Sequence, residues 1–243
     1  MVLRVVDASD YGQRLRPDRK LRVLLTGLQD EAGRGLLRRL ADRNCKLIVQ
    51  TPAESAEIAS LVEDLQAAGA EVSAYYGAID YAAAAMRFTA DAAIMQGSLD
   101  LVVNFVSLRA ADMAEIAENG GGFEDVVEPG LAAAVHGSRV AANRMGLTWR
   151  NGLVVNVLSV DSSAGGAYGA LLAGLARTAL AMCTQSLAER WAEDGIRINA
   201  ITPPATEMSA HDAISDIVFG LLDGGAAHMS GCVFDPDLAH AAC

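Results

Sequence analysis

The sequence predicts one α/β domain in which helices cover both faces of a parallel sheet, the doubly wound arrangement. The chain has 243 residues and is 52% hydrophobic, which is enough to bury one large core. Short β-branched runs alternate with longer Ala-rich, charge-faced segments, as in repeated strand–helix units. Neither an internal repeat nor a low-complexity linker divides the chain. We therefore expect one domain over 21–243, preceded by a polar extension over 1–20.

The individual elements follow from these two kinds of segment. Seven strands are expected where β-branched and aliphatic residues cluster, at 22–25, 47–49, 71–75, 100–106, 153–158, 197–201 and 232–234. Six helices are expected in the Ala-rich segments between them, at 33–44, 53–68, 82–95, 123–145, 167–194 and 212–222. A Gly-rich loop is expected over 119–122. Because helices separate successive strands, all seven strands are expected to run parallel in one sheet.

The charge balance excludes one class of partner. Thirty acidic residues against 19 basic ones give a net charge of −11, and the basic surface that binds a phosphate backbone is missing. We expect no nucleic acid partner. Lys20 and Lys46 are the only lysines.

The cysteines and the apolar runs indicate the cellular compartment of the protein. Cys45, Cys183, Cys232 and Cys243 have no CxxC spacing, so we expect free thiols in a reducing compartment. The first twenty residues lack an apolar signal-peptide core, and charges or glycines break the longest apolar runs. The expectation is a cytoplasmic chain without a membrane segment.

Four segments carry a family resemblance. Residues 26–34 read TGLQDEAGR directly after the first strand, and residues 99–105 read LDLVVNF. Residues 151–159 read NGLVVNVLS, and residues 186–203 read SLAERWAEDGIRINAITP. In order and spacing, over about residues 20–236, these segments resemble the landmarks of the short-chain dehydrogenase/reductase family. The resemblance implies a single Rossmann-like domain and NAD(P)-dependent oxidoreductase chemistry.

The nucleotide-binding turn of that family is degenerate here. Gly27 and Gly33 hold its first and last glycine positions, but Glu31 stands at the middle one. A carboxylate there adds bulk and a like charge beside the pyrophosphate, a repulsion of about 4 kcal/mol at 4 Å and an effective dielectric of 20. We expect this chain to bind no dinucleotide in the usual pose. Asp30 and Glu31 would then be acids of a helix's first turn.

Other cofactor contacts implied by the resemblance are also missing. Gln50-Thr51-Pro52 replaces the acid or base that distinguishes the ribose hydroxyls from a ribose phosphate. Ala78 stands where the family has an Asp near the adenine, and the NNAG motif is reduced to Asn104-Phe105-Val106-Ser107. We expect Asn104 to be a structural hydrogen bonder at a strand end.

The family's catalytic Asn, Ser, Tyr and Lys fall on Gly130, Ser159, Ala173 and Arg177 in this chain. Only the serine is retained. The tyrosine of this tetrad needs a cation one helical turn away, because its pKa of about 10 otherwise prevents acid–base work at neutral pH. None of the five tyrosines has a lysine four residues later, so we expect no catalytic residues.

Other chemistries have little support in the residues. His136, His211, His228 and His240 form no metal-ligand spacing, so no metal site is expected. Ser159 lacks the GxSxG turn of a hydrolase nucleophile. Tyr168 is interpreted as a substrate-loop or interface aromatic.

The resemblance therefore implies a non-catalytic subunit. Its expected partner is an active paralogue, in a heterodimer or heterotetramer, that binds NAD(P) and supplies the tetrad. The complex would be an alcohol or hydroxyacyl-CoA dehydrogenase, of the kind exemplified by hydroxybenzylsuccinyl-CoA dehydrogenase. In this family the helices here expected at 123–145 and 167–194 form a four-helix dimer interface. Small residues along the second helix would permit close approach of a partner, at Ala167, Gly169, Ala170, Ala173, Gly174, Ala176 and Ala179.

Two alternatives stay open. The chain could be an active NAD(P)-dependent oxidoreductase that recruits Ser159, Tyr168 and Arg177 in an unfamiliar way. It could also be a regulatory module whose vacated pocket holds an acyl or CoA group.

Overall fold

A seven-stranded parallel sheet forms the centre of the computed structural model, which describes residues 20–109, 123–148, 151–161, 166–203, 210–223, 225–226 and 228–235. The strands are β1 (Leu21–Thr26), β2 (Cys45–Thr51), β3 (Glu71–Tyr76), β4 (Leu101–Arg109), β5 (Leu153–Asp161), β6 (Arg197–Ile201) and β7 (Val233–Phe234). Their order is β3-β2-β1-β4-β5-β6-β7. The predicted doubly wound α/β fold is confirmed.

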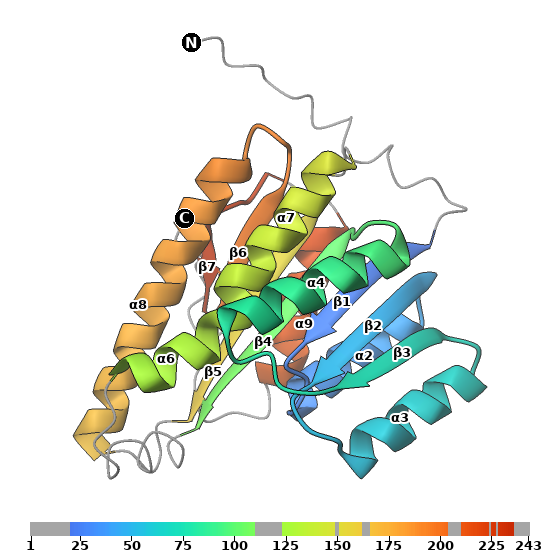
Figure 1. Cartoon of the computed structure of the whole chain (residues 1–243), viewed down its shortest axis with the longest axis horizontal. Helices are drawn as coiled ribbons and strands as arrows, with labels where there is room; N and C mark the ends of the chain where they lie inside the picture. Colours follow the sequence, from blue (N-terminus) through green and yellow to red (C-terminus); the bar gives the residue numbers. More distant parts are fainter. Residues whose placement is uncertain are drawn as a thin grey trace.

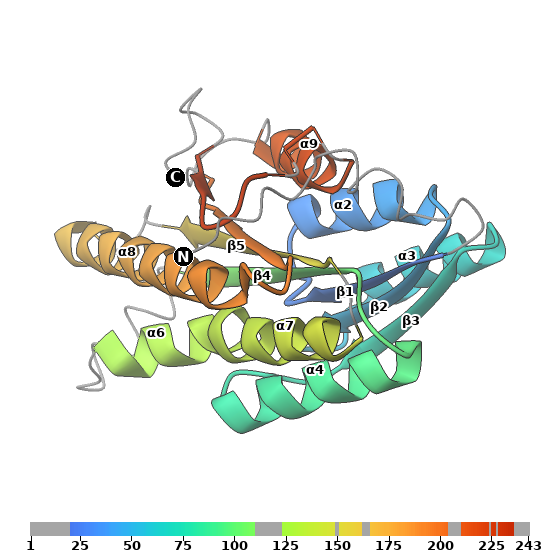
Figure 2. The same cartoon turned by 90° about the horizontal axis from the view of Figure 1, so that it is seen from above.

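Helices cover both faces of this sheet. They are α2 (Glu31–Ala41), α3 (Ala56–Ala67), α4 (Ala82–Gln96), α6 (Phe123–Ala132), α7 (Ser138–Leu147), α8 (Gly166–Trp191) and α9 (Ala210–Leu222). One core cluster joins α2, α3 and α9 to the sheet, and two others join α4, α6, α7 and α8 to its opposite face. Figure 1 shows the sheet between these layers, and Figure 2 shows α2 and α9 across it from α4, α6 and α7.

The predicted elements are all present, with two instructive differences. The helix expected over 33–44 begins at Glu31, because Asp30 caps it by accepting a 2.9 Å hydrogen bond from the Gly33 N–H. The helix expected over 123–145 is interrupted by a π-helical turn at Ala133–Gly137. The Gly-rich loop expected over 119–122 lies outside the described residues.

One expectation about the cysteines is wrong. Cys45 and Cys183 are free, and burial raises the pKa of the Cys45 thiol to about 11. Cys232, however, is disulfide-bonded. A disulfide needs only that two Cβ atoms lie about 4 Å apart in space, which sequence spacing does not reveal. No helix among the described residues has the length and apolarity to cross a membrane.

Four buried polar side chains connect the centre of the sheet to α7. Thr26 Oγ1 donates to Asn104 Oδ1 at 2.8 Å, and Asn104 Nδ2 donates to Asn156 Oδ1 at 2.8 Å. Ser138, at the start of α7, accepts from Asn104 Nδ2 at 3.1 Å and donates to Asn156 Oδ1 at 3.0 Å. All four residues are at most 1% exposed. The network thus joins β1, β4 and β5 to the helix packed over them.

Removing Asn104 should therefore destabilise the whole domain. Asn104→Ala leaves the buried hydroxyl of Thr26 without its acceptor, and Ser138 and Asn156 keep only the 3.0 Å hydrogen bond to each other. A buried polar group left unsatisfied costs about 1–3 kcal/mol. Urea unfolding should show a lower midpoint. Ser73→Ala, on the exposed side of β3, is the control and should shift stability by less than about 0.5 kcal/mol. Equal stability of the two variants would contradict the structural role of the network.

Candidate functional site

The carboxyl ends of the strands border a cleft of about 380 Å³ beside β1 and β4. In doubly wound parallel sheets, ligands bind at this edge, at the point where the order of the strands changes direction. Here that point lies between β1 and β4. Most of the lining is apolar or small. The described lining residues are Gly27, Gln29, Gln50, Pro52, Ala78, Ile79, Asp80, Phe105, Val106, Ser107, Leu108, Asp125, Pro129, Gly130 and Ala133.

Gly27 is required by the backbone at the start of the turn between β1 and α2. Its φ is +72°, and a Cβ placed there would lie 1.9 Å from the carbonyl oxygen of Phe105. Only glycine permits both the left-handed backbone and this close approach. The turn therefore packs directly on the end of β4, and Phe105 itself is 6% exposed.

Gln50 ties the same turn to the end of β3. Its Oε1 accepts from the Gly27 N–H at 2.7 Å, and its Nε2 donates to the Gly77 carbonyl oxygen at 2.6 Å. The side chain is 1% exposed. Both ends of its amide are thus engaged with the backbone, at the position where the sequence comparison expects a group that contacts a ribose.

Glu31 is an acidic residue in the first turn of α2, as the sequence predicts. Its carboxylate pairs with Arg34 at 2.8 Å and Arg38 at 2.6 Å along the surface of α2. Hydrogen bonds from Arg34 and then from Arg38 hold the pKa of Glu31 below its ordinary value. Glu31 is also absent from the described lining of the cleft. The expected repulsion next to a phosphate is therefore largely neutralised by these two arginines.

Asp30 supplies the carboxylate that does face the start of α2. It accepts from the Gly33 N–H, one of the free amides that a helix N-terminus offers to an anionic ligand. Two more carboxylates, those of Asp80 and Asp125, line the cleft. The described lining contains no Lys or Arg.

The four positions that correspond to the family's catalytic tetrad have different surroundings. Gly130 lines the cleft, and a Cβ there would lie 2.4 Å from Leu108 Cδ2. Ser159 is half-buried on β5, opposite Ser107 of β4 in the strand register. Ala173 is 4% exposed and packs in the core cluster that also contains Leu108. Side chains of the hydrophobic core therefore surround two of the four positions, Gly130 and Ala173.

Arg177 lies on α8 one turn beyond Ala173. Its Nε is buried and has no hydrogen-bond partner among the described residues. The side chain of Tyr168 lies outside the described part of the structure, so its expected interface or loop position is not tested.

Comparison with known proteins decides the family. The family model described as short chain dehydrogenase matches residues 22–216. The chain belongs to this short-chain dehydrogenase family. The 3-oxoacyl-[acyl-carrier-protein] reductase FabG of Staphylococcus aureus is 25% identical over 197 residues, which cover 79% of this chain and 77% of that protein. The family relationship thus extends over most of the domain.

Solved structures of short-chain dehydrogenases have the same fold. The citronellol catabolism dehydrogenase AtuB of Pseudomonas aeruginosa superposes with a TM-score of 0.71 at 23% identity, covering 88% of this chain and 92% of that one. A protein described as a short-chain dehydrogenase/reductase, from Sinorhizobium meliloti, gives 0.71 at 22% identity over 90% and 96% of the two chains. These three relatives are named as reductases or dehydrogenases.

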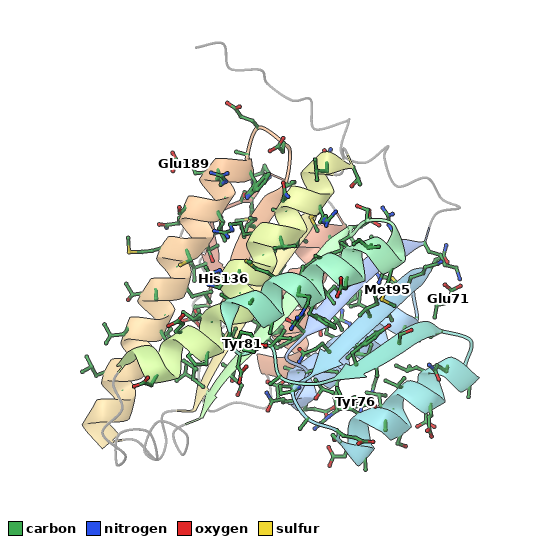
Figure 3. All side chains as sticks on the ribbon, viewed as in Figure 1. Glu71, Tyr76, Tyr81, Met95, His136 and Glu189 are labelled. Carbon is green, nitrogen blue, oxygen red and sulfur yellow. The ribbon has the colours of Figure 1, made fainter. Side chains whose placement is uncertain are left out.

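Several features of this short-chain dehydrogenase chain were not apparent from its sequence. The double hydrogen bond of Gln50 depends on the spacing between three loops. His136 lies in the π-helical turn with its Nδ1 buried and unpartnered among the described residues, and Figure 3 labels its position. Among the residues that the structure describes, no three His, Cys, Asp or Glu side chains gather as a metal site would require.

The pairing of Glu31 leads to a pH-dependent prediction. Because the folded-state pKa of Glu31 is lowered, the ion pairs contribute stability above the unfolded pKa of about 4.3 and lose it as pH falls through the folded value. Glu31→Gln should cost less than about 1 kcal/mol at pH 7, since the groups are largely exposed, and less still at pH 3.5. Urea unfolding at both pH values measures this. Glu63→Gln on α3 is the control, and a Glu31→Gln effect that is equal at both pH values would refute the pairing.

Proposed function

We propose that this chain is a non-catalytic subunit of a short-chain dehydrogenase complex, paired with an active paralogue that supplies the NAD(P) site and the tetrad. The observation that carries the proposal is Ala173. The position that would hold the acid–base tyrosine has a methyl side chain, 4% exposed within the chain's own core. None of the tyrosines in the sequence has a lysine one helical turn later.

Dinucleotide binding also has little support in the cleft. Gly27 would permit the close approach of a pyrophosphate, but Asp30 engages the Gly33 amide, and both ends of the Gln50 side-chain amide are hydrogen-bonded to the backbone. The described lining offers carboxylates and no base to a ligand that carries two negative charges. These residues do not fit NAD(P) in the family's usual pose, and the same charge pattern disfavours the phosphates of CoA.

The surface of α8 supports a role in contacts. Leu171, Leu175 and Met182 are 58%, 42% and 67% exposed, and a Cβ on Gly174 would meet no atom within 4 Å. Exposed apolar side chains on one helix are typical of interaction surfaces. Ala173 and Ala176, in contrast, pack inside the chain's own core, so that part of the small-residue pattern has an internal explanation.

The arginines on the two faces of the sheet also differ in how they are paired. On α2, Arg34, Arg38 and Arg39 all pair with carboxylates of this chain. On α7, Arg139 donates to the sulfur of Met86 at 3.9 Å, and no carboxylate pairs with it among the described residues. On α8, the buried Nε of Arg177 has no hydrogen-bond partner within the described part of the chain. A partner chain that presents a carboxylate to α7 would pair with Arg139.

Co-expression tests the proposal directly. The chain should co-purify with a paralogue from the same genome that keeps the Tyr and Lys of the tetrad, and only the complex should oxidise or reduce substrate. Purification of this chain solely as a homo-oligomer with turnover of its own would overturn the proposal and favour an active enzyme with an unfamiliar site.

A matched pair of variants localises the contact. Leu171→Asp with Leu175→Asp should abolish co-purification, because two charges would be buried against the partner without compensation. Ile94→Asp places the same charge on α4 at a side chain of similar exposure, 63%, and should leave the complex intact. Loss of the complex in the α4 variant alone would place the partner elsewhere.

Cofactor binding separates this role from the alternative of an active enzyme. Titration of the isolated chain with NADH or NADPH, followed by nicotinamide fluorescence, should give no saturable signal, whereas the complex should bind. Saturable binding to the isolated chain would contradict the assignment of the cofactor to the partner.

A further inference from the structure

Backbone amides in the turn between β1 and α2 donate to acceptors of this chain. The Gly27 N–H donates to Gln50 Oε1 at 2.7 Å, and the Leu28 N–H donates to the Gln50 carbonyl oxygen at 3.1 Å. The Gly33 N–H donates to Asp30 Oδ1 at 2.9 Å. In a βα nucleotide site, amides of this turn and of the helix start are the groups that bind a phosphate. Three donors of this turn thus have acceptors that belong to the chain itself.

Gln50 is held in place from two sides. Gly27 offers a donor, and the Gly77 carbonyl oxygen accepts from Gln50 Nε2 at 2.6 Å. This pairing fixes which end of the side-chain amide faces which glycine. Gln50 is 1% exposed and lines the cleft, so its side chain could leave Gly27 only by breaking buried hydrogen bonds. Gln50 is therefore a fixed bridge on the wall of the cleft.

Asp30 places a full negative charge at the start of α2. It is the N-cap of this helix, a role in which serine supplies the same kind of acceptor without a charge. A phosphate that approached the Gly33 amide would meet the Asp30 carboxylate at close range and be repelled by it. The usual attraction of a helix N-terminus for an anion is thus offset by this chain's own acid.

We propose that Asp30 and Gln50 are internal ligands of this turn and exclude a nucleoside diphosphate from it. Asp30 takes the place of a phosphate at the Gly33 amide, and Gln50 takes the place of a nucleotide's polar groups at the Gly27 amide. The inference rests on the proposed function, because a subunit that leaves the cofactor to its partner can dispense with this site. It adds that two side chains cause the exclusion and that removing them reverses it.

Binding of ADP to variants of these two residues tests the proposal. Asp30→Ser keeps a capping oxygen and removes the charge, and Gln50→Ala frees the Gly27 amide. In calorimetric titrations of the full-length chains, the unaltered protein should give no saturable heat. The double variant should bind ADP saturably, at least about tenfold tighter than the detection limit of that titration, because a close like-charge repulsion is removed. Asp30→Ser alone should bind ADP saturably but more weakly.

Asp42→Ser combined with Gln66→Ala is the matched control. Asp42 caps the opposite end of α2, Gln66 donates to the Val72 carbonyl oxygen at 2.7 Å, and neither residue lines the described cleft. This control should not bind ADP. Failure of the Asp30 and Gln50 variants to gain binding, or an equal gain in the control, would overturn the inference and leave the proposed function standing. Saturable ADP binding by the unaltered chain would contradict both.

Hydrogen exchange measures the bridge itself. In the unaltered chain the Gly27 amide should be protected, and ADP should not change its exchange rate. Gln50→Ala should accelerate this exchange at least about tenfold, whereas Gln66→Ala should leave it unchanged. Fast exchange of the Gly27 amide in the unaltered chain, or exchange slowed by ADP, would overturn the proposal. If the double variant lacks a cooperative urea transition, Asp30→Ser alone decides the ADP experiment.

Discussion

The buried network of Thr26, Asn104, Ser138 and Asn156 is the constraint on which the rest of the structure depends. It joins the three central strands to α7 through hydrogen bonds of 2.8–3.1 Å among side chains that are at most 1% exposed. Buried polar groups are stable only when every member has a partner, so the network permits a single relative placement of these elements. That placement puts the ends of β1 and β4 side by side and creates the edge at which the cleft forms.

The scaffold and the chemistry of the family are separable because they use different residues of the same strands. Asn104 and Asn156 hold the sheet, whereas the tetrad positions lie near the strand ends and on the helices beyond them. At two of those positions the core has taken the space. Leu108 lies against Gly130, where a Cβ would come within 2.4 Å, and Leu108 also belongs to the cluster that buries Ala173. Restoring a larger residue at Gly130 would therefore require the side chain of Leu108 to move.

The sequence predicted the seven-stranded parallel sheet and the approximate positions of its strands and helices, because β-branched runs and Ala-rich segments reflect local structure directly. The degenerate positions are residue identities at fixed spacings, and their functional consequence stays a prediction. The sequence did not predict that the Glu31 carboxylate forms ion pairs with Arg34 and Arg38, because these pairs depend on the side-chain conformations along α2. The bridge made by Gln50, the π-helical turn and the disulfide of Cys232 likewise depend on distances between segments that no local pattern encodes.

The division of labour between two subunits is the central claim, and turnover of a complex with a disabled partner tests it most directly. The complex would be purified with the partner's active-site tyrosine changed to phenylalanine, which removes the general acid and keeps the ring. The account predicts that turnover falls to the background rate, since this chain has Ala173 where a second tyrosine would be needed. Residual turnover that persists in this complex and disappears on changing Ser159 or Arg177 of this chain would contradict the account.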